Sequence, residues 1–156
     1  MRVSDYIFKR LVEKYRVEHV FMITGGGAMH LNDAIGRCAG LQYTCNHHEQ
    51  ACAIAAEAYA RSTGRLAVVN VTTGPGGLNT LTGLMGQWTD SVPVLYISGQ
   101  VKQQTTVTRY PRLRLRQLGD QEVDIIEVVK PLTKFAKQIT SLYEVKSVLD
   151  EAVDRA

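Results

Sequence analysis

Two kinds of segment alternate along this chain, short apolar runs and longer stretches with helical periodicity. The apolar runs are typical of strands in a parallel sheet that is covered on both faces. They lie at Val20–Ile23, Leu41–Cys45, Leu66–Val71 and Pro93–Ser98, with a weaker run at Thr133–Ile139. Helical spacing follows in Ser4–Tyr15, Ala28–Cys38, His48–Arg61, the stretch that ends near Trp88, Asp120–Val129 and Leu142–Ala156. This order predicts an α/β fold, a three-layer domain with a mostly parallel sheet.

Length and composition fit one soluble globular domain over residues 1–156. The net charge of +3 is too small to indicate nucleic-acid binding. No apolar run approaches the roughly 20 residues that cross a membrane, and the N-terminus has no signal-peptide core. Three cysteines, Cys38, Cys45 and Cys52, lack the spacing of a zinc site. We interpret them as reduced residues of a cytoplasmic protein.

The helix at His48–Arg61 is rich in alanine and begins where a strand has just ended. Its small side chains allow another backbone or a ligand to come close. Glu49 stands at this strand-to-helix junction, where ligands commonly meet an α/β sheet. The helix N-terminus favours its charge, whereas burial among apolar neighbours opposes it. Taken alone, the stretch favours a glutamate that only complements the helix dipole over a functional one.

Two glycine turns follow strands, Gly25-Gly26-Gly27 and Gly74-Pro75-Gly76-Gly77. The first lacks the glycine that a dinucleotide fingerprint requires, because His30 stands at that position. The second lacks the lysine of a phosphate-binding P-loop. Both turns are explained in part by tight backbone geometry alone.

A histidine metal site and a serine nucleophile elbow are also excluded. His47 and His48 are adjacent and point apart, so they do not make a metal site. Ser98 lacks the glycine pattern of a nucleophile elbow. What remains is a set of strand ends that share one edge of a parallel sheet, where ligands bind. These ends are Gly25–Gly27, His48-Glu49, Thr73–Asn79 and Gly99-Gln100.

Taken in order, these segments resemble the N-terminal pyrimidine-binding domain of thiamine diphosphate enzymes. The resemblance is greatest to the acetolactate synthase large subunit and related 2-oxoacid decarboxylases, and it spans nearly the whole chain. The segments that carry it are Val20-Phe21 with Gly25-Gly26, His48–Ala51, Ala55–Gly64, Val71–Gly76 with Asn79, Asp90–Pro93, Ser98–Val101, Gln121–Ile125 and Pro131–Lys134. Each is weak alone, but their collinear order favours a functional role for Glu49.

The resemblance implies thiamine diphosphate as cofactor and a 2-oxoacid as substrate. Glu49 would hydrogen-bond the N1′ nitrogen of the aminopyrimidine, so that the 4′ nitrogen takes the proton from C2 of the thiazolium. The cofactor would carry the chemistry and the protein would orient it. By the same resemblance, the pocket edge and the subunit contact would be shaped by Gly25, Gly26, Thr73, Gly74 and Asn79. Gln121 would reach toward the cofactor or substrate.

The sequence departs from the family pattern in three places. Thr24 replaces a proline, and Gly119-Asp120 replace an aromatic residue, which leaves the acceptor specificity open. The loop Val101–Gly119 is long and carries Arg109, Arg112, Arg114 and Arg116. It is either a solvated loop or a site that recognises an anionic substrate. Acetolactate synthesis, simple decarboxylation and sugar-modifying carboligation all remain open.

The family's second half-site is missing from this sequence. It binds diphosphate and Mg²⁺ in a separate domain, which would be another part of the polypeptide or another subunit. The resemblance implies five strands here, a sixth beyond Ala156, and a homodimer or larger assembly. FAD binding is not readable from these residues. The alternative is a non-catalytic assembly subunit, or a half-site inactive without a diphosphate-binding partner.

Overall fold

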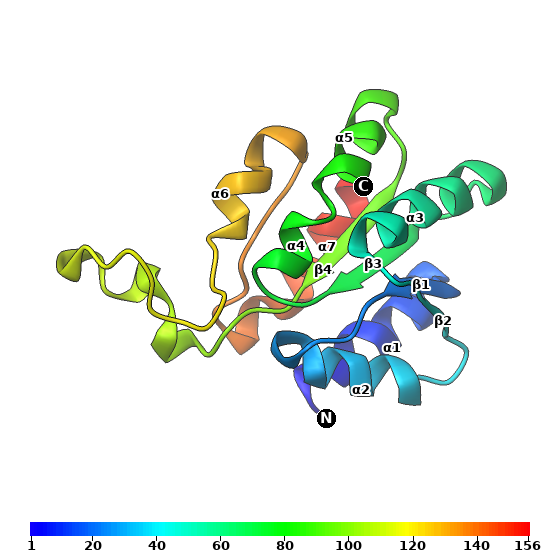
Figure 1. Ribbon diagram of the computed structural model, residues 1–156. Helices are drawn as coiled ribbons and strands as arrows, with labels where there is room; N and C mark the ends of the chain where they lie inside the picture. Colours follow the sequence, from blue (N-terminus) through cyan, green and yellow to red (C-terminus); the bar gives the residue numbers. More distant parts are fainter.

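The computed structural model describes residues 1–156 as a four-stranded parallel sheet with helices on both faces (Figure 1). The strands are β1 (His19–Met22), β2 (Gln42–Cys45), β3 (Ala67–Val71) and β4 (Val94–Ser98), in the order β2-β1-β3-β4. All three pairings are parallel, with Val20 opposite Val68 and Val69 opposite Tyr96. This confirms the predicted three-layer α/β architecture.

The two faces of the sheet are covered by different helices. The helices α1 (Val3–Tyr15), α2 (Met29–Arg37) and α7 (Val145–Arg155) surround the larger core. The other face packs α3 (Glu49–Thr63), with α5 (Leu81–Asp90) against it. Every residue of β3 is buried, and its side chains divide between the two cores. A strand buried on both faces needs a continuous apolar run, which is why the sequence identified it so clearly.

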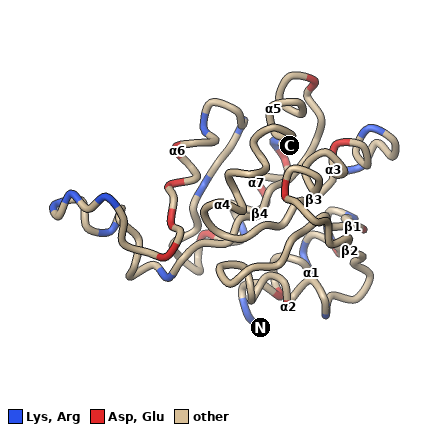
Figure 2. The backbone as a smooth tube through the Cα atoms, viewed as in Figure 1, with Lys and Arg blue, Asp and Glu red and all other residues tan.

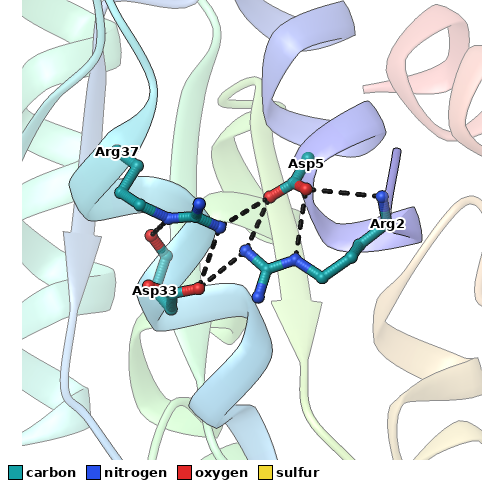
Figure 3. Close-up of polar contacts among 4 residues, drawn as sticks. All are labelled: Arg2, Asp5, Asp33 and Arg37. Carbon is teal, nitrogen blue, oxygen red and sulfur yellow. Dashed lines mark hydrogen bonds and ion pairs between the residues drawn. The ribbon is translucent and has the colours of Figure 1, made fainter.

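Ion pairs join the helices on the α1 side. Arg2 and Asp5 at the start of α1 meet Asp33 and Arg37 of α2, and each carboxylate is shared between two guanidinium groups (Figure 3). Farther along α1, Arg10 makes two hydrogen bonds of 2.6 Å to Asp150 of α7. These contacts fix the three helices against one another on a single face of the sheet.

The structure corrects the expectation of a fifth strand. Thr133–Ile139 is extended, but none of its backbone groups makes a backbone hydrogen bond. A strand requires a neighbouring edge, and here a groove that both segments line separates this segment from β4. The family resemblance therefore overstated the strand count, because this structure has four.

Two predicted helices are shorter than expected. The stretch after the second glycine turn divides into α4 (Pro75–Leu78) and α5. Asp120–Val129 is helical only in α6 (Ile125–Val129), because Gln121 adopts a left-handed φ of 56° and Asp124 caps the helix through the Glu127 amide. The remaining segments are 3₁₀ turns: η1 (Gly26–Ala28), η2 (Gln103–Thr105), η3 (Val107–Arg109), η4 (Pro111–Leu113), η5 (Lys130–Leu132) and η6 (Leu142–Glu144).

The basic loop Val101–Gly119 contains three of these turns and projects from the body of the domain (Figure 2). Its base is closed by Glu122, whose carboxylate accepts the amides of Val107 at 2.7 Å and Gly119 at 3.2 Å. None of its four arginines takes part in an ion pair. Glu122 thus anchors the loop at Val107 and Gly119, and residues 111–118 between these two points are exposed.

Candidate functional site

The first glycine turn packs against Thr72, the residue that follows β3. A methyl group added at Gly25 would lie 2.5 Å from the Thr72 Cβ, so no larger residue fits without displacing that side chain. The Thr72 hydroxyl accepts the Gly27 amide at 3.1 Å. Gly26, by contrast, faces open space. The turn therefore needs glycine at position 25 for its close approach, whereas position 26 is free for contact with something outside the chain.

The second glycine turn is closed by the backbone of a distant segment. Gly74 has a φ of 55°, and a side chain there would place its Cβ 1.8 Å from the Gln121 carbonyl oxygen. Gln121 itself is left-handed and exposed. This contact requires glycine at position 74 for two independent reasons, its backbone conformation and the space available. It also fixes Gln121 at the same edge as Gly74.

Glu49 lies at the start of α3, one residue after His48. The His48 ring caps the helix, with the Gln50 amide donating to Nδ1 over 3.1 Å. The Glu49 Oε2 accepts a hydrogen bond of 3.0 Å from the Asn79 side-chain amide. Its Oε1 faces the backbone of Gly76, 3.7 Å from where a Cβ on that residue would lie. The carboxylate is half-buried and therefore accessible to a ligand group.

Gln100 links three segments of this edge. Its side-chain oxygen accepts the Thr73 hydroxyl at 2.7 Å and the Val101 amide at 2.9 Å. Its side-chain nitrogen donates to the Val123 carbonyl at 3.1 Å. The second glycine turn, the end of β4 and the segment that carries Gln121 are thereby held together by one amide group.

The structure brings the predicted residues to one edge of the sheet through several local contacts. Glu49 meets Asn79, Gly74 meets Gln121, Thr73 meets Gln100, and Gly25 packs on Thr72. The basic loop does not join them, because it projects away from α3 in the view of Figures 1 and 2. The interpretation of this loop as a recognition site for an anionic substrate therefore gains no support within this chain.

Two residues near this edge, Thr72 and Asn70, were not predicted as site residues from the sequence. Thr72 lies under both glycine turns, since methyl groups at Gly25 and Gly76 would both strike it. The sequence could have indicated Thr72, because it stands directly after the fully buried strand, where ligands commonly bind. Asn70 is completely buried and donates to the Asn32 side-chain oxygen at 3.0 Å. A polar residue inside an apolar strand was a second signal, although its own side-chain oxygen has no partner.

The chemistry of this edge is that of a hydrogen-bonding site with one carboxylate. Glu49 is its acidic group, and the residues around it supply amides, hydroxyls and bare glycine backbone. No group of three histidine, cysteine, aspartate or glutamate side chains is placed to hold a metal ion. The arrangement fits a neutral or protonated heterocycle whose ring nitrogen shares a proton with the carboxylate, bounded by flat glycine backbone.

Comparison with known proteins gives a consistent result. The family model described as "Thiamine pyrophosphate enzyme, N-terminal TPP binding domain" matches residues 1–128. The acetolactate synthase large subunit of Haemophilus influenzae is 35% identical over 136 residues, 87% of this chain. The acetolactate synthase of Arthrospira platensis is 37% identical over 144 residues, and the chloroplastic enzyme of Arabidopsis thaliana 33% over 146.

The chain corresponds to only a part of each relative. The matches cover 22% of the Haemophilus protein, 23% of the Arthrospira protein and 20% of the Arabidopsis protein. None of the helices in this chain combines the length and the apolar character that crossing a membrane requires.

Proposed function

The chain belongs to the family of thiamine pyrophosphate enzyme N-terminal TPP-binding domains, and on that premise we propose that residues 1–156 form the pyrimidine-binding part of an acetolactate synthase-like 2-oxoacid decarboxylase or carboligase. The observation that carries this proposal is the position of Glu49. Its carboxylate is hydrogen-bonded by Asn79 and faces the bare backbone of Gly76, on the edge where the strands end. Alone, this chain holds half of a site.

The residues of the edge take separate roles in this proposal. Glu49 holds a proton shared with the N1′ nitrogen of the pyrimidine, and Asn79 orients the carboxylate. Gly25, Gly26 and Gly74 form the walls, and Thr73 joins the second turn to Gln100. Gln121 faces cofactor or substrate from the opposite side of Gly74. When bound, thiamine diphosphate supplies the electron sink for decarboxylation.

The diphosphate and Mg²⁺ are assigned to a different domain or subunit. Glu49 and the amides around it suit a ring nitrogen, and the family resemblance places the diphosphate with its Mg²⁺ in the other half-site. The substrate class is a 2-oxoacid.

Self-association is the second part of the proposal, with a homodimer as the smallest assembly. Three large apolar side chains are exposed on the α3–α5 side of the sheet: Ile54 at 49%, Met85 at 48% and Trp88 at 43%. Ile54 shares its face of α3 with the exposed Ala51 and Ala58, three residues before it and four after it. Sedimentation at micromolar concentration is expected to give a species larger than 17.3 kDa. Sedimentation only at that mass would mean that the interface needs other parts of the enzyme.

The cytoplasm is the proposed compartment. Cys38, Cys45 and Cys52 are all free thiols, as expected in a reducing environment. Burial raises the pKa of the Cys52 thiol to about 11, so this cysteine stays protonated and unreactive at neutral pH.

Replacing Glu49 with glutamine in the complete enzyme tests the proposed role of the carboxylate. Glu49→Gln keeps the shape of the side chain but removes the group that shares a proton. General acid–base assistance contributes roughly 10²–10⁴-fold, so turnover and hydrogen–deuterium exchange at C2 of the bound cofactor should both slow by about that factor.

Glu57→Gln is the matched control, because Glu57 is a carboxylate two turns farther along the same helix and pairs with Arg61. We expect exchange at C2 to remain unchanged in this variant. Equal exchange rates in wild type and Glu49→Gln would show that Glu49 does not activate the cofactor. In that case Glu49 would only complement the dipole of α3.

A further inference from the structure

The basic loop Val101–Gly119 holds the whole net positive charge of the chain. It contains no acidic residue and five basic ones, Lys102, Arg109, Arg112, Arg114 and Arg116. The chain as a whole has 18 basic and 15 acidic residues, so the part outside the loop has 13 basic and 15 acidic residues. Figure 2 shows the basic positions in blue along the projecting loop. Positive charge is therefore concentrated in one segment that stands apart from the body of the domain.

The basic residues of the loop lack ion-pair partners, whereas most basic residues elsewhere have them. Ten of the 13 basic residues outside the loop form salt bridges, and the exceptions are Arg16, Lys134 and Lys137. None of the five in the loop does so. Because like charges placed close together repel one another, an approaching carboxylate is attracted most strongly to this segment.

Leucines alternate with the arginines in the outer part of the loop, in the order Arg112-Leu113-Arg114-Leu115-Arg116. The leucines are also open to solvent, since Leu113 is 63% exposed and Leu115 36%, and Leu118 farther along is 43% exposed. In an extended backbone, an alternation of this kind places the arginines on one side and the leucines on the other. The outer loop thus has the sequence pattern of a strand, although it lies outside the sheet.

The backbone of the outer loop is free to pair with another chain. Residues 114–118 make no hydrogen bond to any other backbone group. Arg114 has a left-handed φ of 48°, which is uncommon for a residue with a side chain. An extended conformation removes this left-handed residue and presents a row of backbone donors and acceptors. Because Glu122 holds the loop at Val107 and Gly119, only the outer part has to change its conformation.

These properties define the chemistry of a partner, which must supply negative charge, apolar groups and backbone hydrogen bonds together. An extended peptide that alternates acidic and apolar residues supplies all three. In extended segments, successive side chains on one side are roughly 6.6–6.8 Å apart, so its carboxylates and the arginines of the loop repeat at the same interval. A phosphate ion would leave the leucines without contact, and a lipid interior would leave the backbone groups of the loop unsatisfied.

We propose that residues 112–118 form a docking site for an acidic segment of a partner protein, in which acidic and apolar residues alternate and which pairs with the loop as an added β-strand. The arginines bind its carboxylates, the leucines pack on its apolar side chains, and the free backbone groups pair with its backbone. The inference goes beyond the proposed function of the chain. It does not depend on the role proposed for Glu49.

The test measures binding of a short fluorescent peptide, in which glutamate and valine alternate, to the full 156-residue chain by fluorescence anisotropy. We expect saturable binding that weakens by about tenfold or more when Arg112, Arg114 and Arg116 are all replaced by glutamine. Because residues 111–118 are exposed, this variant should keep the circular dichroism spectrum of the wild type. Bound peptide should also slow amide hydrogen exchange at residues 115–118 by about tenfold, whereas amides of β1 should exchange as before.

The matched control is Lys134→Gln combined with Lys137→Gln, which removes two cations that also lack ion pairs but lie outside the loop. This variant should bind the peptide as the wild type does. A second control is a peptide of the same composition with all glutamates in one block and all valines in another. It should bind more weakly by about fivefold or more, because it cannot place carboxylates and apolar side chains on opposite sides.

Equal binding by the wild type and the triple arginine variant would overturn the proposal. Equal binding of the alternating and the block peptide, or unchanged exchange at residues 115–118 with peptide bound, would show charge attraction alone and would overturn the added strand. Binding of phosphatidylserine-containing vesicles or of inorganic pyrophosphate, with no binding of the alternating peptide, would overturn the choice of a protein segment as the partner.

Discussion

The glycine-turn edge and the α1–α2–α7 face are stabilised by different kinds of contact. The glycine-turn edge comprises Gly25–Gly27, Glu49, Thr72–Asn79, Gln100 and Gln121, and it is held by backbone contacts and by hydrogen bonds that involve no arginine or lysine. The α1–α2–α7 face combines the larger apolar core with ion pairs between helices. The glycine-turn edge places a single carboxylate next to an amide. On the α1–α2–α7 face, each carboxylate that joins two helices is paired with arginine.

This difference distinguishes carboxylates that are paired with arginine from the one that is not. The Asp150 carboxylate has little tendency to take up a proton, because its hydrogen bonds to Arg10 lower its pKa. Glu49 has an amide donor and no cation among its hydrogen-bond partners. The following predictions test whether backbone fit governs the first region and charge pairing the second.

Gly74→Ala should have the largest effect on stability. The new methyl group would overlap the Gln121 carbonyl, and alanine is strained at a φ of 55°. We expect a loss of ~3 kcal/mol or more in the free energy of unfolding, measured by urea denaturation. Gly26→Ala is the control, because its methyl group would meet open space and should change stability by less than about 0.5 kcal/mol. Similar losses in both variants would contradict the argument from backbone fit.

Asp150→Asn should have the largest effect on the opposite face. The Asp150 side chain is only 16% exposed and accepts hydrogen bonds from Arg10, Tyr15 and Lys146. Asparagine removes the charge and leaves Arg10 without its counterion. We expect a loss of about 2 kcal/mol in the free energy of unfolding. Surface substitutions usually change the free energy of unfolding by less than about 0.5 kcal/mol, so a change of that size would show that this ion pair contributes no more than a solvent-exposed one.

The same residue predicts a dependence of stability on pH. Hydrogen bonding to Arg10 holds the pKa of the Asp150 carboxyl well below its usual value. Because the folded pKa is below the unfolded value of about 3.9, this contribution is present above that pH and is lost as the pH falls below it. Urea denaturation between neutral pH and pH 3 should therefore show a decline in stability. The decline should be smaller in Asp150→Asn, and an unchanged slope would contradict the linkage.

Arg37→Ala should have the smallest effect. Arg37 pairs with Asp5 and Asp33, but its side chain is 58% exposed and both partners also contact Arg2 (Figure 3). Solvent-exposed ion pairs contribute little, so we expect a loss below about 1 kcal/mol that shrinks further in high salt. Thermal unfolding at two salt concentrations measures it. A loss as large as that of Asp150→Asn would remove the distinction between the two clusters.

Local pattern was sufficient to predict the architecture and the position of Glu49. The strand β3 is an unbroken apolar run, and α3 begins after a strand and ends at Gly64, so neither depends on a distant partner for its identification. The glycine turns were also visible, because a strand followed by glycines indicates a tight turn. From these elements the sequence determined a parallel α/β sheet and the edge on which its site residues lie.

The tertiary structure alone decided which distant residues meet and which segments find partners. The contact of Asn79 with Glu49 and of Gln121 with Gly74 joins segments whose separation along the chain carries no local signal. Gln121 also takes a left-handed conformation that shortens the predicted helix to α6. Thr133–Ile139 has the composition of a weak strand but lacks a neighbouring edge to pair with. A segment becomes a strand only when a second segment pairs with it, whereas periodicity describes one segment alone. The pairing of Thr133–Ile139 therefore depended on the tertiary fold.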